Sequence, residues 1–541
     1  MQKTVYVKDY VTLPCEDAAP GIMAAVEEAK RIGADVLEFE AGVYSLKQVI
    51  AFETDQTAHD ATGVYRSTKD VHVLLHDLHN CTVTGQVDEN GKPATVLEGM
   101  NELKLHDLMP SVLWVDGGSC VTVQNFKFRR NPEFCSSGQV ESVDGNTVYV
   151  KVFEGNPCYD NMGTYCMNKF TPDGDLDGES LSYGPGLGVN FRLVGERLLS
   201  LESEKVAGRV KPGDILTFHQ GSRTDFQCFY GNVDQLTLRN LHTTNSNGFA
   251  SLAFNIHNLT IDHVRFQPEG NQYFTAPRDA FKLHKCHGNI KVDGMYVQGV
   301  RMDGQNMHSN YIQFRSRLAA DTVQFFSRYA KTPLVVGSDM EFYFGEEKKT
   351  VKIKSWSHGG KAEQAGMYGN LLNVTFEQPL DWELSETDLF LPACWEPDLY
   401  ECTNSHFRNV AGAGHLSRID HMRISGCTFT NMMNAGILLG AEYPTHYEGG
   451  HCTDIRIWDC VFDHCGGTAR YGAAGCIGIK SAGLPGKNNK DIRIENCLFR
   501  NSPIGVDIHD ADDVLITNCG FDNIDQLLRV DEETCGSIVC E

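Results

Sequence analysis

The chain has 541 residues, 41% of them hydrophobic and 22% charged, a composition typical of a folded globular protein. Its formal net charge of −24 argues against nucleic acid as a partner, because phosphate binding requires a basic patch. It contains no run of about eighteen apolar residues, which argues against a membrane span.

The N-terminal sequence and the cysteines bear on the compartment. Residues 1–9 lack the apolar stretch of a secretory signal, so we expect a cytoplasmic protein, or a secreted one if the chain was trimmed. The 19 cysteines are an odd number, which favours reduced thiols packed as small hydrophobic side chains over a disulfide framework. The cysteine and histidine spacings do not indicate zinc, and we expect neither a metal nor another cofactor.

The first predicted element is a helix over residues 17–32. It starts at Asp17 and Pro20, and its apolar side chains recur at helical spacing on one face. An apolar strand and a glycine turn follow in residues 34–44. Such a helix can cover the open end of a stack of β-strands, and short strands continue to about residue 128.

Two long stretches then lack this strand pattern, residues 129–230 and 312–400. The first contains a hairpin signal in residues 140–150, with Asp144-Gly145 at the turn. We expect both stretches to be small β-barrel domains inserted into the main fold. The main fold would then consist of residues 1–128, 231–311 and 401–541.

The clearest pattern is a hexad that returns four times near the C-terminus. It places Cys and Phe on one face of a short strand, with polar residues between them. The copies are Ile424-Ser-Gly-Cys427-Thr-Phe429, Ile457-Trp-Asp-Cys460-Val-Phe462, Ile494-Glu-Asn-Cys497-Leu-Phe499 and Ile516-Thr-Asn-Cys519-Gly-Phe521.

Weaker copies of the hexad start at Val123, Leu238, Ile261 and Val292. A strand that recurs every 20–40 residues or so is typical of a solenoid, in which stacked coils bury what one coil cannot. The sequence therefore predicts an all-β fold: a right-handed parallel β-helix with a capping helix and two inserted barrels.

Two acidic residues are spaced by about one solenoid turn. Asp279 and Asp303 would then stand on adjacent coils roughly 5 Å apart, where one carboxylate raises the pKa of the other. Acid–base catalysis uses this arrangement. From spacing alone, two carboxylates that merely cap coil turns explain the pattern equally well.

A third acidic group lies in the loop Gly440-Ala-Glu442-Tyr-Pro-Thr-His446-Tyr447-Glu448-Gly449-Gly450. Aromatic faces and carboxylates are the groups that hold sugars, so this composition suits a glycan pocket. A solvated turn is the alternative.

Taken together, these motifs resemble glycoside hydrolase family 110. The similar features are an Asp-x-Phe run at Asp279, an Asp-x-x-Asn-x-His run from Asp303 to His308, and the Tyr447-Glu448 loop. The resemblance implies an inverting, exo-acting α-1,3-galactosidase on a parallel β-helix with two inserted barrels. It covers most of the chain from about residue 12.

The resemblance also implies the site residues. Asp279, Asp303 and Glu448 fall on acidic, catalytic positions, and the residues implied to bind substrate are Lys282, Asn306, His308, Glu442, His446 and Tyr447. The expected partner is an oligosaccharide or glycan substrate, with a homodimer left open.

The chain departs from the family pattern at several positions. Met302-Asp303 stands where two adjacent aspartates are typical, Lys282 where histidine is common, and Gly449-Gly450 where Ser-Gly is usual. Two alternatives therefore stay open beside the galactosidase. One is a polyuronate lyase or hydrolase on the same fold, and the other is a glycan-binding relative without catalysis.

Overall fold

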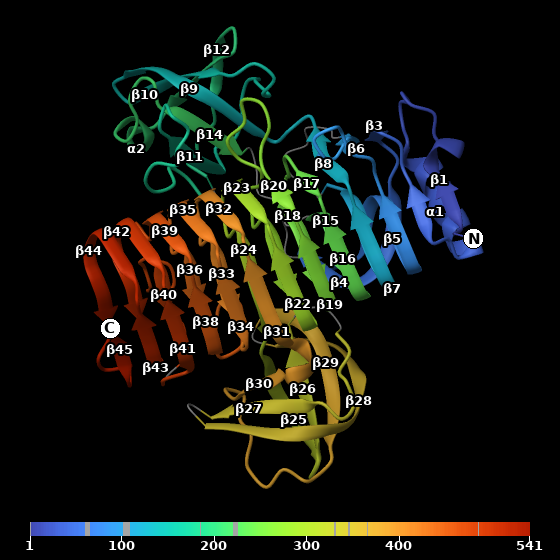
Figure 1. The fold of residues 1–541 in the computed structure, drawn as a ribbon, viewed down its shortest axis with the longest axis vertical. Helices are drawn as coiled ribbons and strands as arrows, with labels where there is room; N and C mark the ends of the chain where they lie inside the picture. Colours follow the sequence, from blue (N-terminus) through green and yellow to red (C-terminus); the bar gives the residue numbers. More distant parts are fainter. Residues whose placement is uncertain are drawn as a thin grey trace.

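The computed structural model describes residues 2–59, 65–100, 109–183, 186–219, 226–328, 332–344, 347–364, 366–484 and 486–541. It contains one long β-helix that runs from the N-terminus to the C-terminus, with one insert on each side (Figure 1). Within the described residues, no helix is both long and apolar enough to cross a membrane.

Three parallel sheets form the walls of the β-helix. The first contains β1 (Thr4–Tyr6), β2 (Val36–Glu38), β16 (Asp234–Arg239), β19 (His257–Asp262), β22 (His287–Asp293), β31 (Pro397–Thr403), β34 (Met422–Ser425), β38 (Thr453–Trp458), β41 (Asn489–Glu495), β43 (Ala511–Thr517) and β45 (Ile538–Cys540).

The second sheet contains β3 (Gly42–Leu46), β6 (Thr95–Met100), β8 (Phe126–Asn131), β17 (His242–Thr243), β20 (Arg265–Phe266), β23 (Tyr296–Val300), β32 (His406–Val410), β35 (Thr428–Met432) and β39 (Val461–Cys465).

The third sheet contains β15 (Phe226–Gly231), β18 (Phe249–Phe254), β21 (Phe281–His284), β24 (Gln305–Asn310), β33 (His415–Arg418), β36 (Ile437–Leu439) and β40 (Ile477–Ile479). Four longer strands pass from one sheet into the next: β5 (Tyr65–Thr84), β7 (Ser111–Gln124), β42 (Leu498–Ile508) and β44 (Gly520–Val530). β4 (Ile50–His59) pairs antiparallel with β5.

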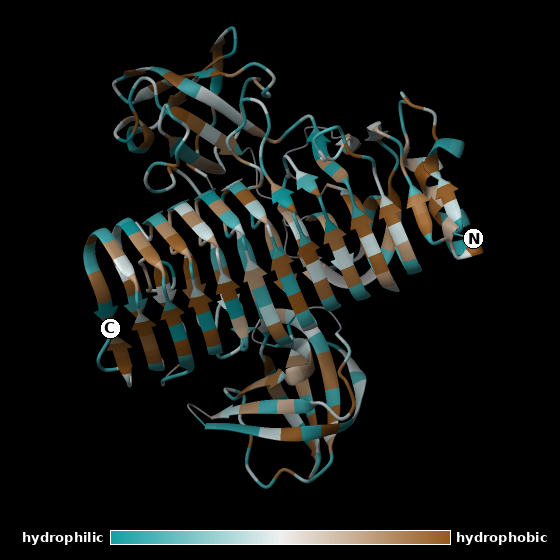
Figure 2. Ribbon diagram, in the orientation of Figure 1, coloured by the Kyte–Doolittle hydropathy of each residue, from teal (hydrophilic) through white to brown (hydrophobic). Residues whose placement is uncertain are grey.

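The hexads form the interior as predicted. Phe407, Phe429, Phe462, Phe499 and Phe521 stack in one column, with ring centroids 4.9 to 5.1 Å apart. Apolar and polar residues alternate along the solenoid strands (Figure 2). The cysteine two residues before the phenylalanine of each hexad is a free thiol. Cys427, Cys460 and Cys497 are buried, and Cys519, near the C-terminal end of the solenoid, is half-buried.

The residue before each of these cysteines turns the chain at a corner of the coil. Gly426, Asp459, Asn496 and Asn518 all have φ between 53° and 61°, in the left-handed region. Gly, Asn and Asp tolerate this conformation best, which explains why the third hexad position varies among these three residues.

The predicted capping helix is α1 (Ala19–Ile32), which covers the N-terminal end of the solenoid (Figure 1). Ile22, Ala25, Val26 and Ala29 are buried in the main core. Asp17, at the predicted start of the helix, accepts hydrogen bonds from the backbone of Ala19 and of Lys47. This aspartate therefore connects the helix to the first coil.

The first insert is a six-stranded antiparallel sheet with a core of its own. Its strands pair in the order β11-β14-β9-β10-β13-β12. They are β9 (Cys135–Asp144), β10 (Thr147–Val152), β11 (Cys166–Phe170), β12 (Arg192–Gly195), β13 (Leu198–Glu202) and β14 (Ile215–His219), with the short helix α2 (Glu204–Ala207). The predicted hairpin is confirmed: β9 and β10 pair across Asp144-Gly145.

The second insert is a closed barrel in the order β25-β26-β29-β28-β27-β30. Its strands are β25 (Ile312–Ala319), β26 (Thr322–Ser327), β27 (Asp339–Phe344), β28 (Glu347–Gln364), β29 (Met367–Phe376) and β30 (Leu389–Pro392). The expected barrel closure is thus present in the second insert, while the first pairs as an open sheet. The exact domain boundaries stay a prediction.

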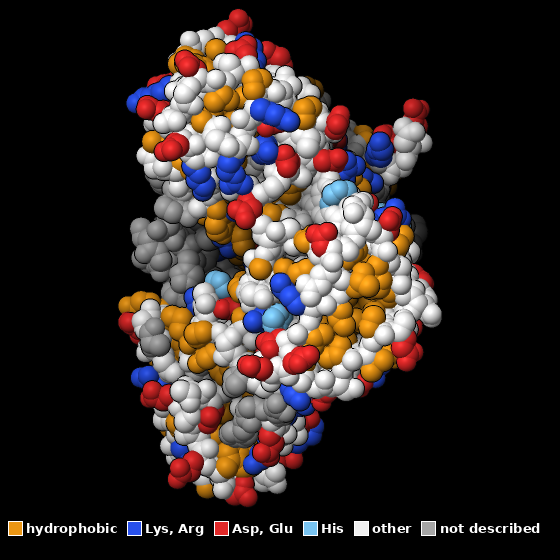
Figure 3. Space-filling model, turned by 90° about the vertical axis from the view of Figure 1, so that its left-hand side faces the viewer, with side chains coloured by type: hydrophobic (Ala, Val, Ile, Leu, Met, Phe, Trp, Pro, Cys, Tyr) orange, Lys and Arg blue, Asp and Glu red, His pale blue; other side chains and the backbone are white. Residues whose placement is uncertain are grey.

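Seen from its C-terminal end, the molecule is hollowed between the first insert and the solenoid (Figure 3). Acidic and basic side chains are interspersed over this face.

Candidate active site

The acidic pair predicted from the sequence lies on neighbouring coils of the third sheet. Asp279 precedes β21 and Asp303 precedes β24 at the equivalent position, and the amide of Ala280 donates to the carbonyl of Asp303 over 3.0 Å. Both aspartates are buried. The spacing of about one turn therefore brought the two carboxylates together, as expected.

Asn306, on β24, connects the two carboxylates. Its Nδ2 donates to Oδ2 of Asp279 over 3.2 Å and lies 3.5 Å from Oδ2 of Asp303. One amide group shared by two carboxylates keeps their oxygens close together in a buried space. This places Asn306 in the site, as the resemblance implied.

Asp303 has two further partners. The backbone amide of Ala413 donates to its Oδ1 over 3.0 Å, and the guanidinium of Arg470 forms an ion pair with the same oxygen. A Cβ added to the neighbouring Gly412 would lie 2.9 Å from this oxygen and 2.5 Å from the carbonyl group of Met302. A glycine at position 412 is therefore required for the carboxylate to sit against the next coil.

The two carboxylates differ in their electrostatics. Burial and the negative charge of Asp303 raise the pKa of Asp279 to about 6, although Lys282, Arg278 and Arg470 partly offset this. Burial lowers the pKa of Arg470, but the carboxylate of Asp303 outweighs it and raises this pKa above its ordinary value. Asp303 thus has a cation of its own in Arg470, whereas Asp279 changes its charge near pH 6.

Glu448 reaches the site from β37 (Glu448–Gly449), which pairs antiparallel with β24. Its carboxylate oxygens lie 2.9 Å from Nε of Arg418, 3.3 Å from Nε2 of His308 and 3.6 Å from Nζ of Lys282. Lys282, His308 and Arg418 belong to β21, β24 and β33, three successive strands of the third sheet.

The charge of Glu448 follows from these neighbours. Burial alone would raise its pKa, but His308, Arg418 and Lys282 hold the pKa well below its usual range. Burial also lowers the pKa of His308 to about 3, so its imidazole is neutral at neutral pH. Glu448 is therefore ionised under most conditions, which suits a group that accepts hydrogen bonds better than one that donates a proton.

The remaining predicted residues lie in the loop before Glu448. The carboxylate of Glu442 accepts hydrogen bonds from the backbone amides of Thr445 and His446, over 3.1 and 2.7 Å. The hydroxyl of Tyr447 accepts one from Gln313, on the second insert, over 3.2 Å. Glu442 and Tyr447 thus shape the loop, and His446 is exposed. Their contact with substrate stays a prediction.

Two arginines of the site were missed by the sequence reasoning. Arg418 is buried and stacks on the ring of Tyr471 at 4.9 Å, and Arg470 lies 5.1 Å from the same ring. Once the coil register is known, Arg418 is found directly beside His308 on the next strand. Arg470 lies in a loop whose sequence is typical of a solenoid turn, and no motif in that loop indicates a site residue.

The first insert contributes to the rim of the site. The hydroxyl of Tyr183 donates to the sulfur of Met302 over 3.0 Å, and the guanidinium of Arg301 stacks on the ring of Tyr183 at 4.2 Å. Met302 stands where the family typically has a second aspartate. At this position the chain therefore has an apolar side chain that holds the insert close to the acidic pair.

The site contains many cations, yet those closest to the carboxylates are paired. Arg418 faces Glu448 and Arg470 faces Asp303. Lys285 is buried elsewhere, 3.9 Å from the ring of Trp395. These arginines therefore neutralise site carboxylates and do not form the free basic groove that an acidic polysaccharide would require.

Proteins of known name are similar to this chain in sequence. No family model matches the chain. It is 22% identical to an α-1,3-galactosidase A of Bacteroides fragilis over 92% of this chain and 83% of that protein. It is 23% identical to an α-1,3-galactosidase B of Phocaeicola vulgatus over 82% and 76% of the two chains. The chain is similar in sequence to proteins named α-1,3-galactosidase over most of its length.

This relationship confirms the resemblance to glycoside hydrolase family 110 inferred from the motifs. Among solved structures, the catalytic domain of a GH87 α-1,3-glucanase in complex with nigerose aligns with a TM-score of 0.42 at 9% identity, covering 100% of this chain and 68% of that one. A mannuronan C-5 epimerase A-module of Azotobacter vinelandii aligns with a TM-score of 0.39 at 11% identity, covering 99% of each chain.

Proposed function

We propose that this chain is an exo-acting glycoside hydrolase that releases terminal α-linked galactose from oligosaccharides or glycans with inversion of configuration. The names of its relatives support glycoside hydrolysis and suggest the sugar. The observation that carries the proposal is the buried pair Asp279 and Asp303, joined by Asn306 and backed by Arg470.

In the proposed reaction, Asp303 is the base that removes a proton from the attacking water. Its ion pair with Arg470 and the amide of Ala413 stabilise its ionised form. Asp279 faces the same space through Asn306 and accepts the second hydrogen bond of that water. Two acceptors aim the lone pair of the water at the anomeric carbon. As the bond to the glycosidic oxygen breaks, that oxygen takes its proton from a solvent water on the opposite face of the sugar.

Glu448 has a different role in this proposal. Its carboxylate, Lys282 and Arg418 form a compact group of charged donors and acceptors beside the acidic pair. Such groups hold the hydroxyls of a single terminal sugar. Because the pKa of Glu448 is held low, we assign it to sugar binding and not to proton donation.

The test is the hydrolysis of a panel of nitrophenyl glycosides, with the anomer of the first product followed by NMR. Fast release from the α-galactoside with β-galactose as the first product supports the proposal. General acid–base catalysis is worth about 10²–10⁴-fold, so Asp303→Asn should lose at least that factor in kcat. Release of α-galactose first, or a near-native Asp303→Asn enzyme, contradicts it.

Met302 supports a second candidate, a glycan-binding relative with weak catalysis. Inversion needs a proton donor across the sugar from the base, about 6.5–9.5 Å away, and Met302 removes one family carboxylate from the rim. Glycosides with good leaving groups need little protonation. Cleavage of galactosyl fluoride without cleavage of a galactosyl disaccharide would favour this second candidate.

A further inference from the structure

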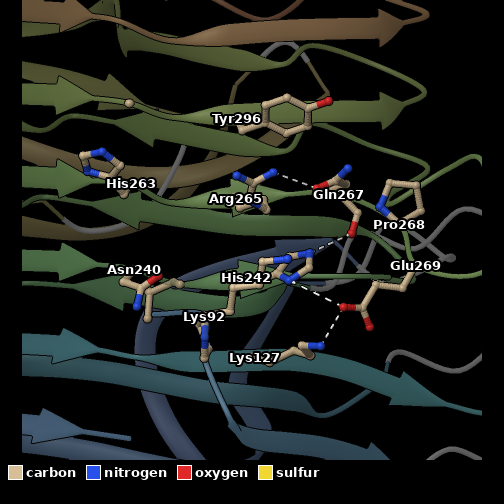
Figure 4. Close-up of a pocket in the computed structure, with 13 residues that line it drawn as sticks. Lys92, Lys127, Asn240, His242, His263, Arg265, Gln267, Pro268, Glu269 and Tyr296 are labelled. Atoms are coloured by element: carbon tan, nitrogen blue, oxygen red, sulfur yellow. Dashed lines mark hydrogen bonds and ion pairs between the residues drawn. The ribbon is translucent and has the colours of Figure 1, made fainter. Parts of the chain in front are cut away.

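A second cavity lies on the second sheet of the solenoid, which does not carry the acidic pair. It has a volume of about 390 Å³ and is lined by residues of β8, β17, β20 and β23 and of two flanking loops (Figure 4). None of these residues takes part in the site described above.

The floor of this cavity is a ladder of outward-facing side chains. Lys127, His242, Arg265 and Tyr296 pair in register on four successive coils. Their neighbours in sequence, Phe128, Thr243, Phe266 and Val297, are buried, as strand alternation requires. Parallel strands are about 4.8 Å apart, so the ladder offers one polar or aromatic group at each such step.

The wall of the cavity is a solenoid corner. Asn240, His263 and Gly294 occupy equivalent corner positions with φ between 48° and 63°. A Cβ at Gly294 would lie 3.1 Å from the imidazole of His263. The glycine therefore leaves space beside this ring, which opens the cavity at its corner.

The charges of the cavity are unequal. Lys127 is paired with Glu269 at 2.6 Å, and His263 with Asp262 at 2.5 Å. Burial lowers the pKa of His242 below its ordinary value, and the carbonyl oxygen of Gln267 lies 3.0 Å from its Nε2. Lys127 and Glu269 therefore neutralise each other, and the lowered pKa of His242 keeps its imidazole mostly neutral at neutral pH.

Arg265 and Lys92 differ from the groups above. Among the residues that the structure describes, neither has a carboxylate within 4.0 Å. Arg265 donates to Oε1 of Gln267 over 2.8 Å and stacks on Tyr296 at 4.7 Å, so its guanidinium points toward Gln267 on the same coil (Figure 4). A cavity with two unpaired cations is unusual in a chain with a net charge of −24.

We propose that this cavity binds an acidic saccharide, a sugar that carries a sulfate or a carboxylate group. Arg265 and Lys92 bind the anionic group, and guanidinium is well suited to both oxyanions. Asn240, Gln267 and His242 supply hydrogen bonds for hydroxyls, and the aromatic face of Tyr296 contacts the ring.

Because none of the residues that line the cavity belongs to the site of Asp279 and Asp303, the proposal does not depend on the proposed hydrolase activity. Binding here would hold the protein on an acidic glycan without cleaving it there.

The test is affinity electrophoresis of the full chain in native gels that contain chondroitin sulfate, polygalacturonate or neutral dextran. We expect retardation by one or both acidic polymers and none by dextran. The sulfated and the carboxylated arms show which anionic group is preferred. Ion exchange cannot mimic the result, because an acidic protein is repelled by acidic polymers.

The matched variants are Lys92→Gln and Arg265→Gln, with Lys354→Gln in the second insert as an exposed control. Loss of one charge-assisted contact should weaken the affinity about tenfold for each cavity variant. The control should bind as the wild type does, and all three should keep the same rate on a nitrophenyl galactoside. Equal retardation of all variants, or equal retardation by dextran, overturns the proposal.

Discussion

The partly buried Arg470 forms an ion pair with the buried Asp303 although 167 residues separate them in the chain. The arginine comes from the loop between β39 and β40 of a late coil, and the aspartate stands before β24. The candidate base of the site therefore receives its cation from a coil several positions further along the solenoid.

Removing this arginine should change the pH dependence of the reaction. In Arg470→Gln, Asp279 loses one of the cations that lower its pKa, so the limb of the kcat/KM profile near pH 6 moves to higher pH. The variant should also be less stable by about 3–5 kcal/mol, because a buried charge is left without its partner. Arg470→Lys should restore part of both losses.

The control is Arg456→Gln, which removes a half-exposed arginine from the outer wall, paired with Asp491 at 2.9 Å. It should cost at most about 1 kcal/mol and leave the pH profile unchanged. If Arg470→Gln shows only the stability loss and an unshifted profile, Arg470 is structural and does not tune the acidic pair.

The pKa of Asp279 predicts the shape of the wild-type pH profile. If Asp279 must be ionised to hold the attacking water, kcat/KM should rise with pH through about 6. Initial rates between pH 4 and 8, with substrate well below KM, measure this. A rate that falls through the same range would instead identify Asp279 as the proton donor.

The buried carboxyl group of Asp279 should also lower the stability of the folded protein at neutral pH. Its folded pKa of about 6 exceeds the value of 3.8 expected for the unfolded chain, so the unfolded state loses its proton first as the pH rises. Its contribution to stability is present below about pH 4 and is lost as the pH rises to about 6. Each pKa unit is worth about 1.4 kcal/mol, so the ionised group costs about 3 kcal/mol at neutral pH.

Asp279→Asn should therefore raise the thermal midpoint at pH 7.5 while lowering kcat by about 10²-fold or more. At pH 4.5 the midpoints of the variant and the wild type should converge. A variant that is less stable than the wild type at both pH values would show that the carboxylate supports the fold.

The fold could be predicted from the sequence because its interactions repeat. Each hexad contributes the same buried Cys and Phe, so one pattern reports many coils. The spacing of Asp279 and Asp303 predicted their contact for the same reason, because residues separated by one coil length lie side by side on adjacent coils. The hexads lie in the third part of the solenoid, where insertions are short.

The parts that could not be predicted depend on contacts between distant segments. Arg418 and Arg470 are brought to the carboxylates by the register of coils that are separated from β24 by an inserted barrel. Tyr183 arrives from the other insert. Such contacts are set by how two folded units dock, and no local spacing encodes this.

Tyr183 offers a test of whether the first insert takes part in recognition. Its hydroxyl donates to the sulfur of Met302, and its ring stacks with the guanidinium of Arg301. Tyr183 is 43% exposed at the rim. We expect Tyr183→Ala to raise KM for a branched glycan several-fold while KM for a nitrophenyl galactoside stays within twofold. Tyr183→Phe, which keeps the ring, should resemble the wild type on both substrates. Equal KM changes on the small and the branched substrate would show that Tyr183 acts on the terminal-sugar pocket and not on the remainder of the glycan.

A thermal melt of each variant separates these effects from a loss of docking between the insert and the solenoid.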